Sequence, residues 1–225
     1  MAGLAAAVGN GVPGRMKPVA IALLGAESTG KTTLANGLAQ ALRSVGRRVV
    51  LVPEYLREWC DREGRVPRAD EQLHIAEEQA RRVDAVQDAD IVIADTTPVL
   101  TAVYSDKLFD DRSLYAFALQ HQRQYAATLL SGLDLPWVAD GLQRDGPHLR
   151  STIDAGVRAA LADAGLGWRV VYGAGNNRLG SALSALGPLS SGAAPPLPKA
   201  ATARWQCLNC DDAQCEHRLF SRLKR

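Results

Sequence analysis

One stretch of sequence decides the fold of this chain: Val19-Ala20-Ile21-Ala22-Leu23-Leu24-Gly25-Ala26-Glu27-Ser28-Thr29-Gly30-Lys31-Thr32. The apolar run before Gly25 predicts a buried strand, and the stretch from Thr32 to Val45 predicts a helix. Gly25-x-x-x-x-Gly30-Lys31-Thr32 between them is the pattern of a phosphate-binding loop of the Walker A type. The alternative is a chance glycine-rich turn, which does not explain the flanking strand and helix.

The loop pattern has a chemical reason. Glycines let successive backbone N–H groups turn toward phosphate oxygens, and the helix that follows adds the positive end of its dipole. Lys31 is expected to reach the β- and γ-phosphates of ATP, and Thr32 to ligate Mg²⁺. The sequence therefore predicts ATP and Mg²⁺ as cofactors, held by Gly25, Ala26, Glu27, Ser28, Thr29, Gly30, Lys31, Thr32 and Thr33.

The rest of the chain alternates apolar runs with helix-prone stretches. Further strands are predicted at 48–52, 91–94, 128–130 and 168–172, and further helices at 69–88, 113–125 and 152–164. Strands that are apolar throughout and alternate with helices indicate an α/β fold, with a parallel sheet covered by helices on both faces. We therefore expect one P-loop NTPase domain over residues 17–186.

Three carboxylates follow predicted strands, at the edge of the sheet where open α/β folds bind ligands. Asp95 follows the strand at 91–94, which suits a second Mg²⁺ group; the alternative is an N-cap aspartate. Glu54 follows the strand at 48–52, where it could accept the proton of an attacking hydroxyl; a solvent-facing loop glutamate is an equal alternative. Asp140 fits a turn residue better than a functional one.

One arginine lies within the polar stretch from Gln143 to Leu149, and a second follows it. Arg144 and Arg150 are candidates to close over a transferring phosphoryl group, where a cation stabilises the transition state. Surface positions are the alternative for either one.

Several motifs occur together in one order: the loop Gly25 to Thr32, Pro53-Glu54-Tyr55-Leu56-Arg57-Glu58, Ile75-Ala76-Glu77-Glu78-Gln79, Asp95-Thr96-Thr97 and Pro136-Trp137-Val138-Ala139-Asp140-Gly141-Leu142-Gln143-Arg144. This series resembles the ribosylnicotinamide kinase domain of the bacterial NAD-biosynthesis protein NadR and its stand-alone relatives, often labelled AAA-family ATPases. The resemblance covers roughly residues 17–186.

The resemblance implies a nucleoside-kinase-like fold with five parallel strands and a mobile lid over Gln143 to Arg150. It implies ATP as donor and a nucleoside ribose hydroxyl as acceptor. By the same likeness, Lys31, Glu54, Asp95 and Arg144 are the expected catalytic residues, and Glu54, Tyr55 and Gln79 the expected substrate-binding residues.

Two functions stay open at this point. The first is phosphoryl transfer to a nucleoside, above all ribosylnicotinamide, with Tyr55 and Trp59 either stacking on the base or packing within a helix. The second is a regulatory ATPase that changes shape with ATP and binds a protein partner.

Composition excludes other classes. The net charge is +2, and no basic block with interleaved aromatics is present, so we expect no nucleic-acid partner. No apolar run spans a bilayer and no signal-peptide pattern is present, so a cytoplasmic protein is expected. Homo-oligomerisation is left open.

The two ends of the sequence differ from the middle. Residues 1–16 are predicted to be a flexible leader, and Met16 is an alternative start. Residues 187–203, rich in Pro, Ala and Ser, predict a linker to a small element at 204–225. Cys207, Cys210, Cys215 and His217 in that element have a spacing that suits a structural zinc ion, with a tail of incidental cysteines as the alternative.

Overall fold

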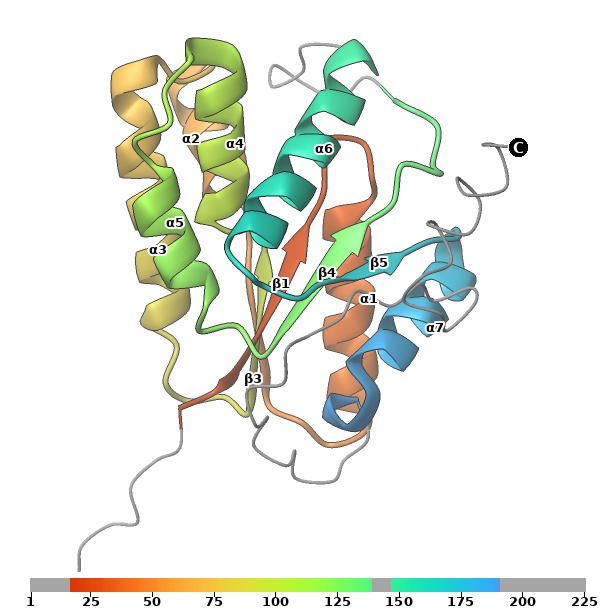
Figure 1. Cartoon of the computed structure of the whole chain (residues 1–225). Helices are drawn as coiled ribbons and strands as arrows, with labels where there is room; N and C mark the ends of the chain where they lie inside the picture. The colour runs from red at the N-terminus through yellow and green to blue at the C-terminus, as the bar shows by residue number, and fades with distance from the viewer. Residues whose placement is uncertain (1–16, 139–146, 191–225) are drawn as a thin grey trace, which may run out of the picture.

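A parallel β-sheet forms the centre of the computed structural model, which describes residues 17–138 and 147–190. Its five strands are β1 (Val19–Leu24), β2 (Val49–Val52), β3 (Ile91–Asp95), β4 (Ala127–Ser131) and β5 (Arg169–Val171). They lie in the order β2-β3-β1-β4-β5, and every neighbouring pair is parallel (Figure 1). The five-stranded parallel sheet expected from the sequence is confirmed.

Helices cover both faces of the sheet. α1 (Lys31–Ser44) and α7 (Gly175–Leu186) lie together on one face (Figure 1). α3 (Gln72–Asp84), α4 (Pro98–Phe109), α5 (Tyr115–Gln122) and α6 (Pro147–Asp163) cover the other, and α2 (Tyr55–Glu63) packs on α3. Two short 3₁₀ turns, η1 (Ala69–Glu71) and η2 (Gly187–Leu189), complete the described elements. No helix in these described ranges is long and apolar enough to cross a membrane.

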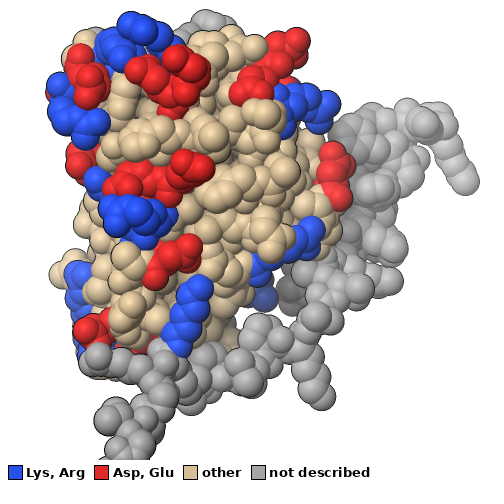
Figure 2. Space-filling view, turned by 90° about the vertical axis from the view of Figure 1, so that its left-hand side faces the viewer, with Lys and Arg blue, Asp and Glu red and all other residues tan. Residues whose placement is uncertain are grey.

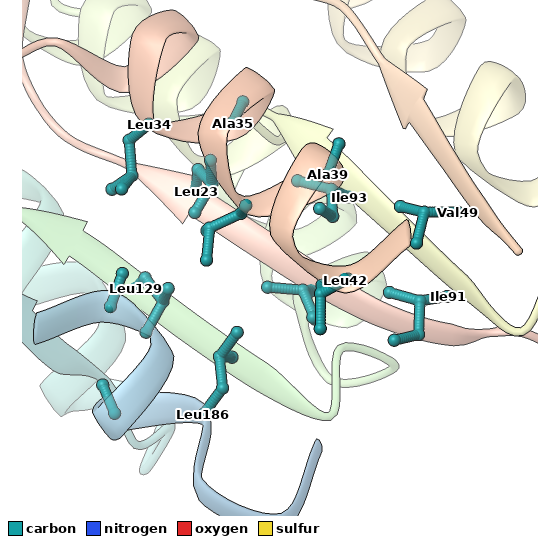
Figure 3. Close-up of a cluster of buried hydrophobic side chains, with 14 of the residues drawn as sticks. Leu23, Leu34, Ala35, Ala39, Leu42, Val49, Ile91, Ile93, Leu129 and Leu186 are labelled. Atoms are coloured by element: carbon teal, nitrogen blue, oxygen red, sulfur yellow. The ribbon is translucent and has the colours of Figure 1, made fainter. Parts of the chain in front are cut away.

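The central strand β1 shows why its sequence is apolar throughout. Ile21 and Leu23 face α1 and α7, whereas Ala20 and Ala22 face the opposite layer. Figure 3 shows the first of these clusters, in which Leu34 of α1 and Leu186 of α7 meet the side chains of the strands. Because both faces are buried, every position of β1 except the first is at most 6% exposed.

The outer helices α2 and α3 are joined by charged side chains. Figure 2 shows acidic and basic groups interspersed on the side where these helices lie. Arg82 of α3 forms ion pairs with Glu58 of α2 and with Glu78 of its own helix. Its guanidinium carbon also lies 4.4 Å from the centre of the Tyr55 ring. These contacts fix the position of α2, whose first residue follows Glu54.

Among the described elements, α4 and α7 were not predicted from the sequence, and α2 was foreseen only as the packing alternative for Tyr55 and Trp59. The expected strands and the other helices are present within a few residues of their predicted bounds. The folded part also continues slightly past residue 186, because Leu189 of η2 packs against the cluster of α1 and α7.

Candidate nucleotide-binding site

The loop between β1 and α1 has the backbone conformation of an anion-binding turn. Gly25, Ser28 and Gly30 have positive φ angles of 145°, 54° and 73°. Gly25 also needs the space, since a Cβ there would lie 3.0 Å from the Cβ of Ser131 and from Oγ1 of Thr29. Gly30 is the N-cap of α1, and no side chain of the described residues caps this helix. The N-terminal amides of α1 therefore suit a phosphate group.

Lys31 and Thr29 fold back onto the same loop. Nζ of Lys31 donates to the carbonyl of Ala26 at 3.1 Å, and Oγ1 of Thr29 donates to that carbonyl at 2.7 Å. The Lys31 side chain thus arches over the turn, only 9% exposed, with its charge beside the amides that would face the phosphates. The contact of Lys31 to the β- and γ-phosphates stays a prediction.

Thr32 and Asp95, the two expected Mg²⁺ groups, are in direct contact. Oγ1 of Thr32 donates to Oδ2 of Asp95 at 2.6 Å. Asp95 ends β3, opposite Leu23 of β1 in the sheet register, and is 2% exposed. Its other oxygen, Oδ1, is buried and has no hydrogen-bond partner among the described residues. A hydroxyl and a buried carboxylate oxygen beside a phosphate-binding loop are ligands that suit Mg²⁺.

A cavity of about 1070 Å³ opens above the loop. Residues 27–33 form one end of it, which includes Lys31 and Thr32. The opposite end is mostly apolar, with walls from α2, α4 and the segment at 66–67: Leu56, Cys60, Val66, Pro67, Leu100, Tyr104, Leu108 and Phe109. Its volume is at the upper end of the range for small-molecule sites, so it has room for a nucleotide together with a second molecule.

Glu54 is a carboxylate that lines the same cavity. It precedes α2 and lines the cavity together with Arg57 and Gln72. Its side chain is 10% exposed, and Oε2 lies 3.7 Å from Nη2 of Arg57. The same cavity therefore contains the phosphate-binding loop and a carboxylate that can meet a hydroxyl group.

The other two expected substrate-binding residues lie behind the cavity wall. Oε1 of Gln79 accepts the backbone N–H of Tyr55 at 2.8 Å, and both residues are buried. The Tyr55 and Trp59 rings pack with Cys60 and Ile75 in a small apolar cluster, and neither ring lines the cavity. In this conformation Gln79 orients the start of α2, and the packing alternative accounts for both aromatic rings.

Arg150, the last residue of the expected lid, belongs to α6 and is 8% exposed. It donates to the carbonyls of Leu135 and Ser28 at 2.7 and 3.2 Å. Arg144 and Asp140 lie outside the described residues, as do Cys207, Cys210, Cys215 and His217. Zinc binding by that tail stays a prediction; the ranges 17–138 and 147–190 contain no group of three or more metal-ligating residues.

Some residues around the site were not found from the sequence. The α4 wall was missed although Thr97-Pro98 is a helix-start signal, in which the Thr97 hydroxyl accepts from the amide of Val99. Arg178 and Asp134 were missed because no local pattern marks them. They meet across the loops after β5 and β4, where Nη1 of Arg178 donates to Oδ1 of Asp134 at 3.1 Å.

Comparison with known protein families shows the family of this chain. A family model described as an AAA domain matches residues 20–178, which is more than half of the chain. The chain belongs to this AAA domain family. Among curated proteins, no sequence matches it.

Solved structures place this AAA domain among P-loop kinase folds. A NadR structure in complex with NR is 20% identical with a TM-score of 0.62, over 80% of this chain and 53% of that one. A NadR structure with NAD and AMP-PNP is 18% identical with a TM-score of 0.60, over 80% and 52%. Thymidylate kinase from Ehrlichia chaffeensis is 15% identical with a TM-score of 0.55, over 77% and 100%.

The AAA domain thus spans about half the length of the NadR chains. Family and fold agree with the prediction of a P-loop kinase or ATPase domain.

Proposed function

We propose that this AAA domain transfers the γ-phosphoryl group of ATP to a ribose hydroxyl of a nucleoside, with ribosylnicotinamide as the preferred acceptor and NAD biosynthesis as the setting. One observation carries the proposal. The phosphate-binding loop, Glu54 and an apolar wall line one cavity, so that donor and acceptor can bind next to each other.

The donor end has the groups that ATP needs. The amides of the loop and Lys31 would bind the phosphates of ATP, with Lys31 at the β- and γ-phosphates. Thr32 and Asp95 would hold Mg²⁺. When bound, this ion supplies charge neutralisation on the phosphate oxygens.

The acceptor end supplies orientation and a base. The hydroxyl of the acceptor donates its proton to the Glu54 carboxylate, and its oxygen forms the new bond to the γ-phosphorus. The bond from that phosphorus to the β–γ bridging oxygen breaks, and ADP leaves with the electron pair. Arg57, whose Nη2 lies 3.7 Å from Oε2 of Glu54, places a positive charge beside this carboxylate.

The apolar wall suits a flat ring better than a second charged group. Leu100, Tyr104 and Leu108 of α4 line the same cavity as Leu56 and Cys60 of α2. A nucleoside base can lie between such walls, with its ribose directed to Glu54. The likeness to a NadR structure in complex with NR supports ribosylnicotinamide as the first acceptor to test. The cytoplasm, where ATP is abundant, stays the predicted compartment.

The test is a nucleoside panel with the purified full chain, Mg²⁺ and ATP, followed by ADP release. Ribosylnicotinamide is compared with adenosine, uridine and thymidine, and with no acceptor. We expect ribosylnicotinamide to raise ADP release at least ~10-fold above the rate without acceptor, since only a positioned hydroxyl competes with water at this site.

A slow rate that no nucleoside changes would contradict the proposal. That result would favour the regulatory ATPase, in which ATP hydrolysis drives a change of shape.

A further inference from the structure

A buried arginine lies directly behind the phosphate-binding loop. Arg178 is on the first turn of α7 and is 3% exposed. Its Nη2 donates to the carbonyls of Thr29 and Gly132 at 2.9 and 3.3 Å. Its Nη1 donates to the carbonyl of Gly173 at 2.7 Å and to Asp134 at 3.1 Å. One guanidinium therefore joins the loops that follow β1, β4 and β5.

The contact with Thr29 has a direct consequence for phosphate binding. The carbonyl of Thr29 and the N–H of Gly30 belong to one planar trans peptide, so they point in opposite directions. When Arg178 holds this carbonyl on the α7 side, the amide of Gly30 is turned the other way, toward the cavity that Gly30 lines. The guanidinium thus fixes the direction of an amide in the predicted phosphate cradle.

Arg150 makes the same kind of contact with the carbonyl of the preceding residue, Ser28. Its Nη2 donates to the carbonyl of Ser28 at 3.2 Å, which orients the amide of Thr29 in the same manner. Its Nη1 is anchored on the carbonyl of Leu135. Two buried arginines, from α6 and α7, therefore hold consecutive peptides of the turn.

Asp134 holds Arg178 in place. Burial raises the pKa of this carboxyl, but the N–H of Gly173 at 2.6 Å and Arg178 itself outweigh that effect and keep its pKa below the ordinary value. The pair is therefore ionised at neutral pH. A buried ion pair contributes little to stability compared with apolar residues of the same size. Its geometry, a planar fork with four acceptors, fits a role in positioning.

We propose that Arg178 is a positioning residue for nucleotide binding, which holds the phosphate-binding loop open to phosphate and joins it to the loops after β4 and β5. This inference rests on the proposed function only in placing ATP on that loop. It is independent of the acceptor.

The test measures Mg-ADP affinity by calorimetry in four variants of the full chain, with thermal unfolding of each. Arg178→Met removes the guanidinium, Arg178→Lys keeps the charge without the fork, and Asp134→Asn loosens the anchor. Arg169→Met is the matched control, because Arg169 also donates to a carbonyl at α7, that of Ala185, away from the cavity.

We expect ADP affinity to fall about 30-fold in Arg178→Met, about 10-fold in Arg178→Lys and about 3-fold in Asp134→Asn, in line with the loss of charged hydrogen bonds. Arg169→Met should bind ADP as the wild-type chain does. If Arg178→Met does not fold, the ADP affinities of Arg178→Lys and Asp134→Asn test the proposal.

Wild-type ADP affinity in both Arg178→Lys and Asp134→Asn, whatever their unfolding temperatures, would overturn the proposal, because a merely structural arginine changes stability alone. A wild-type chain that binds ADP but phosphorylates no nucleoside would overturn the proposed function and leave this inference standing. A wild-type chain that binds no ADP would overturn both.

Discussion

The two ends of the cavity are built in different ways. At the donor end the binding groups are backbone amides, fixed by the strained turn at 25–30 and braced by Arg150 and Arg178. At the acceptor end they are side chains on α2 and α4, most of them apolar. Backbone amides recognise any phosphate chain, whereas a side-chain wall is specific to one shape. Under the proposed function, the donor end would identify the reaction class and the acceptor end would decide the substrate.

We expect the largest loss of turnover from a substitution at the donor end. Lys31→Ala removes the cation that arches over the loop, and we expect turnover to fall by at least ~100-fold, the size of a single electrostatic contribution at such sites. Steady-state kinetics with purified protein of wild-type unfolding temperature is the measurement. Near-normal turnover would show that the loop is not the donor site.

Exchanging one carboxylate at each end separates their roles. Glu54→Gln keeps geometry but removes basicity, so we expect a ~100-fold loss of nucleoside phosphorylation with unchanged ADP affinity. Asp95→Asn should weaken Mg-ADP binding and slow any background hydrolysis as well, because it changes the buried partner of Thr32. Equal losses of nucleotide affinity in both variants would mean that Glu54 belongs to the donor end.

Truncating a side chain in the apolar wall should change the KM of the acceptor but not the KM of ATP. Leu108→Ala removes a half-exposed side chain that lines the cavity. We expect the binding free energy of the acceptor to weaken by about 1 kcal/mol, so its KM should rise roughly fivefold. The KM of ATP should stay the same. Leu73→Ala is the control, since Leu73 on α3 is similarly exposed but does not line the cavity. If Leu108→Ala changed only the KM of ATP, the apolar wall would not be the binding site of the acceptor.

The smallest effect concerns a site away from both ends. His121 is 8% exposed, with Asp84 3.6 Å away, Phe117 and Tyr125 beside its ring, and Lys17 nearby. Burial lowers its pKa despite Asp84, so the unfolded chain takes up a proton more readily than the folded one. Stability should therefore fall as the pH drops through about 6.5, the ordinary value.

Unfolding temperatures at pH 7.5 and 5.5 measure this loss. In His121→Phe the difference between the two temperatures should shrink by a few degrees, with KM values unchanged at pH 7.5. An unchanged difference would assign the acid sensitivity between these two pH values to other groups. Glu71 and Glu78 are not among them, because their stabilising effect is lost only as the pH falls below the ordinary value of 4.5 toward about 2.

The sequence predicted the donor end well because its signals are local. The strand, the loop glycines and Lys31-Thr32 stand within fourteen consecutive residues, and each has a conformational or chemical reason. Asp95 was predicted from its place at the end of an apolar strand, and the register of β3 beside β1 confirms that it reaches this edge of the sheet.

The helices that form the acceptor end were harder to predict from the sequence, for physical reasons. α4 is buried around much of its circumference, so it lacks the one-sided apolar period that marks a helix. α2 is short and begins two residues after Pro53. Arg178 reaches Thr29 across 149 positions of sequence, a contact that only the folded sheet creates. Gln79 could be singled out by resemblance, but its hydrogen bond to the Tyr55 amide depends on the packing of α2 on α3.

Phosphoryl transfer to a nucleoside is tested by following the γ-phosphoryl group when the full chain is given γ-labelled ATP, Mg²⁺ and ribosylnicotinamide. Mass spectrometry of the products, with Glu54→Gln run in parallel, shows where the label goes. The account predicts label on the ribose of the nucleoside in wild type and its near-absence in the variant. Label found only in inorganic phosphate, at one rate with or without the nucleoside, would contradict it.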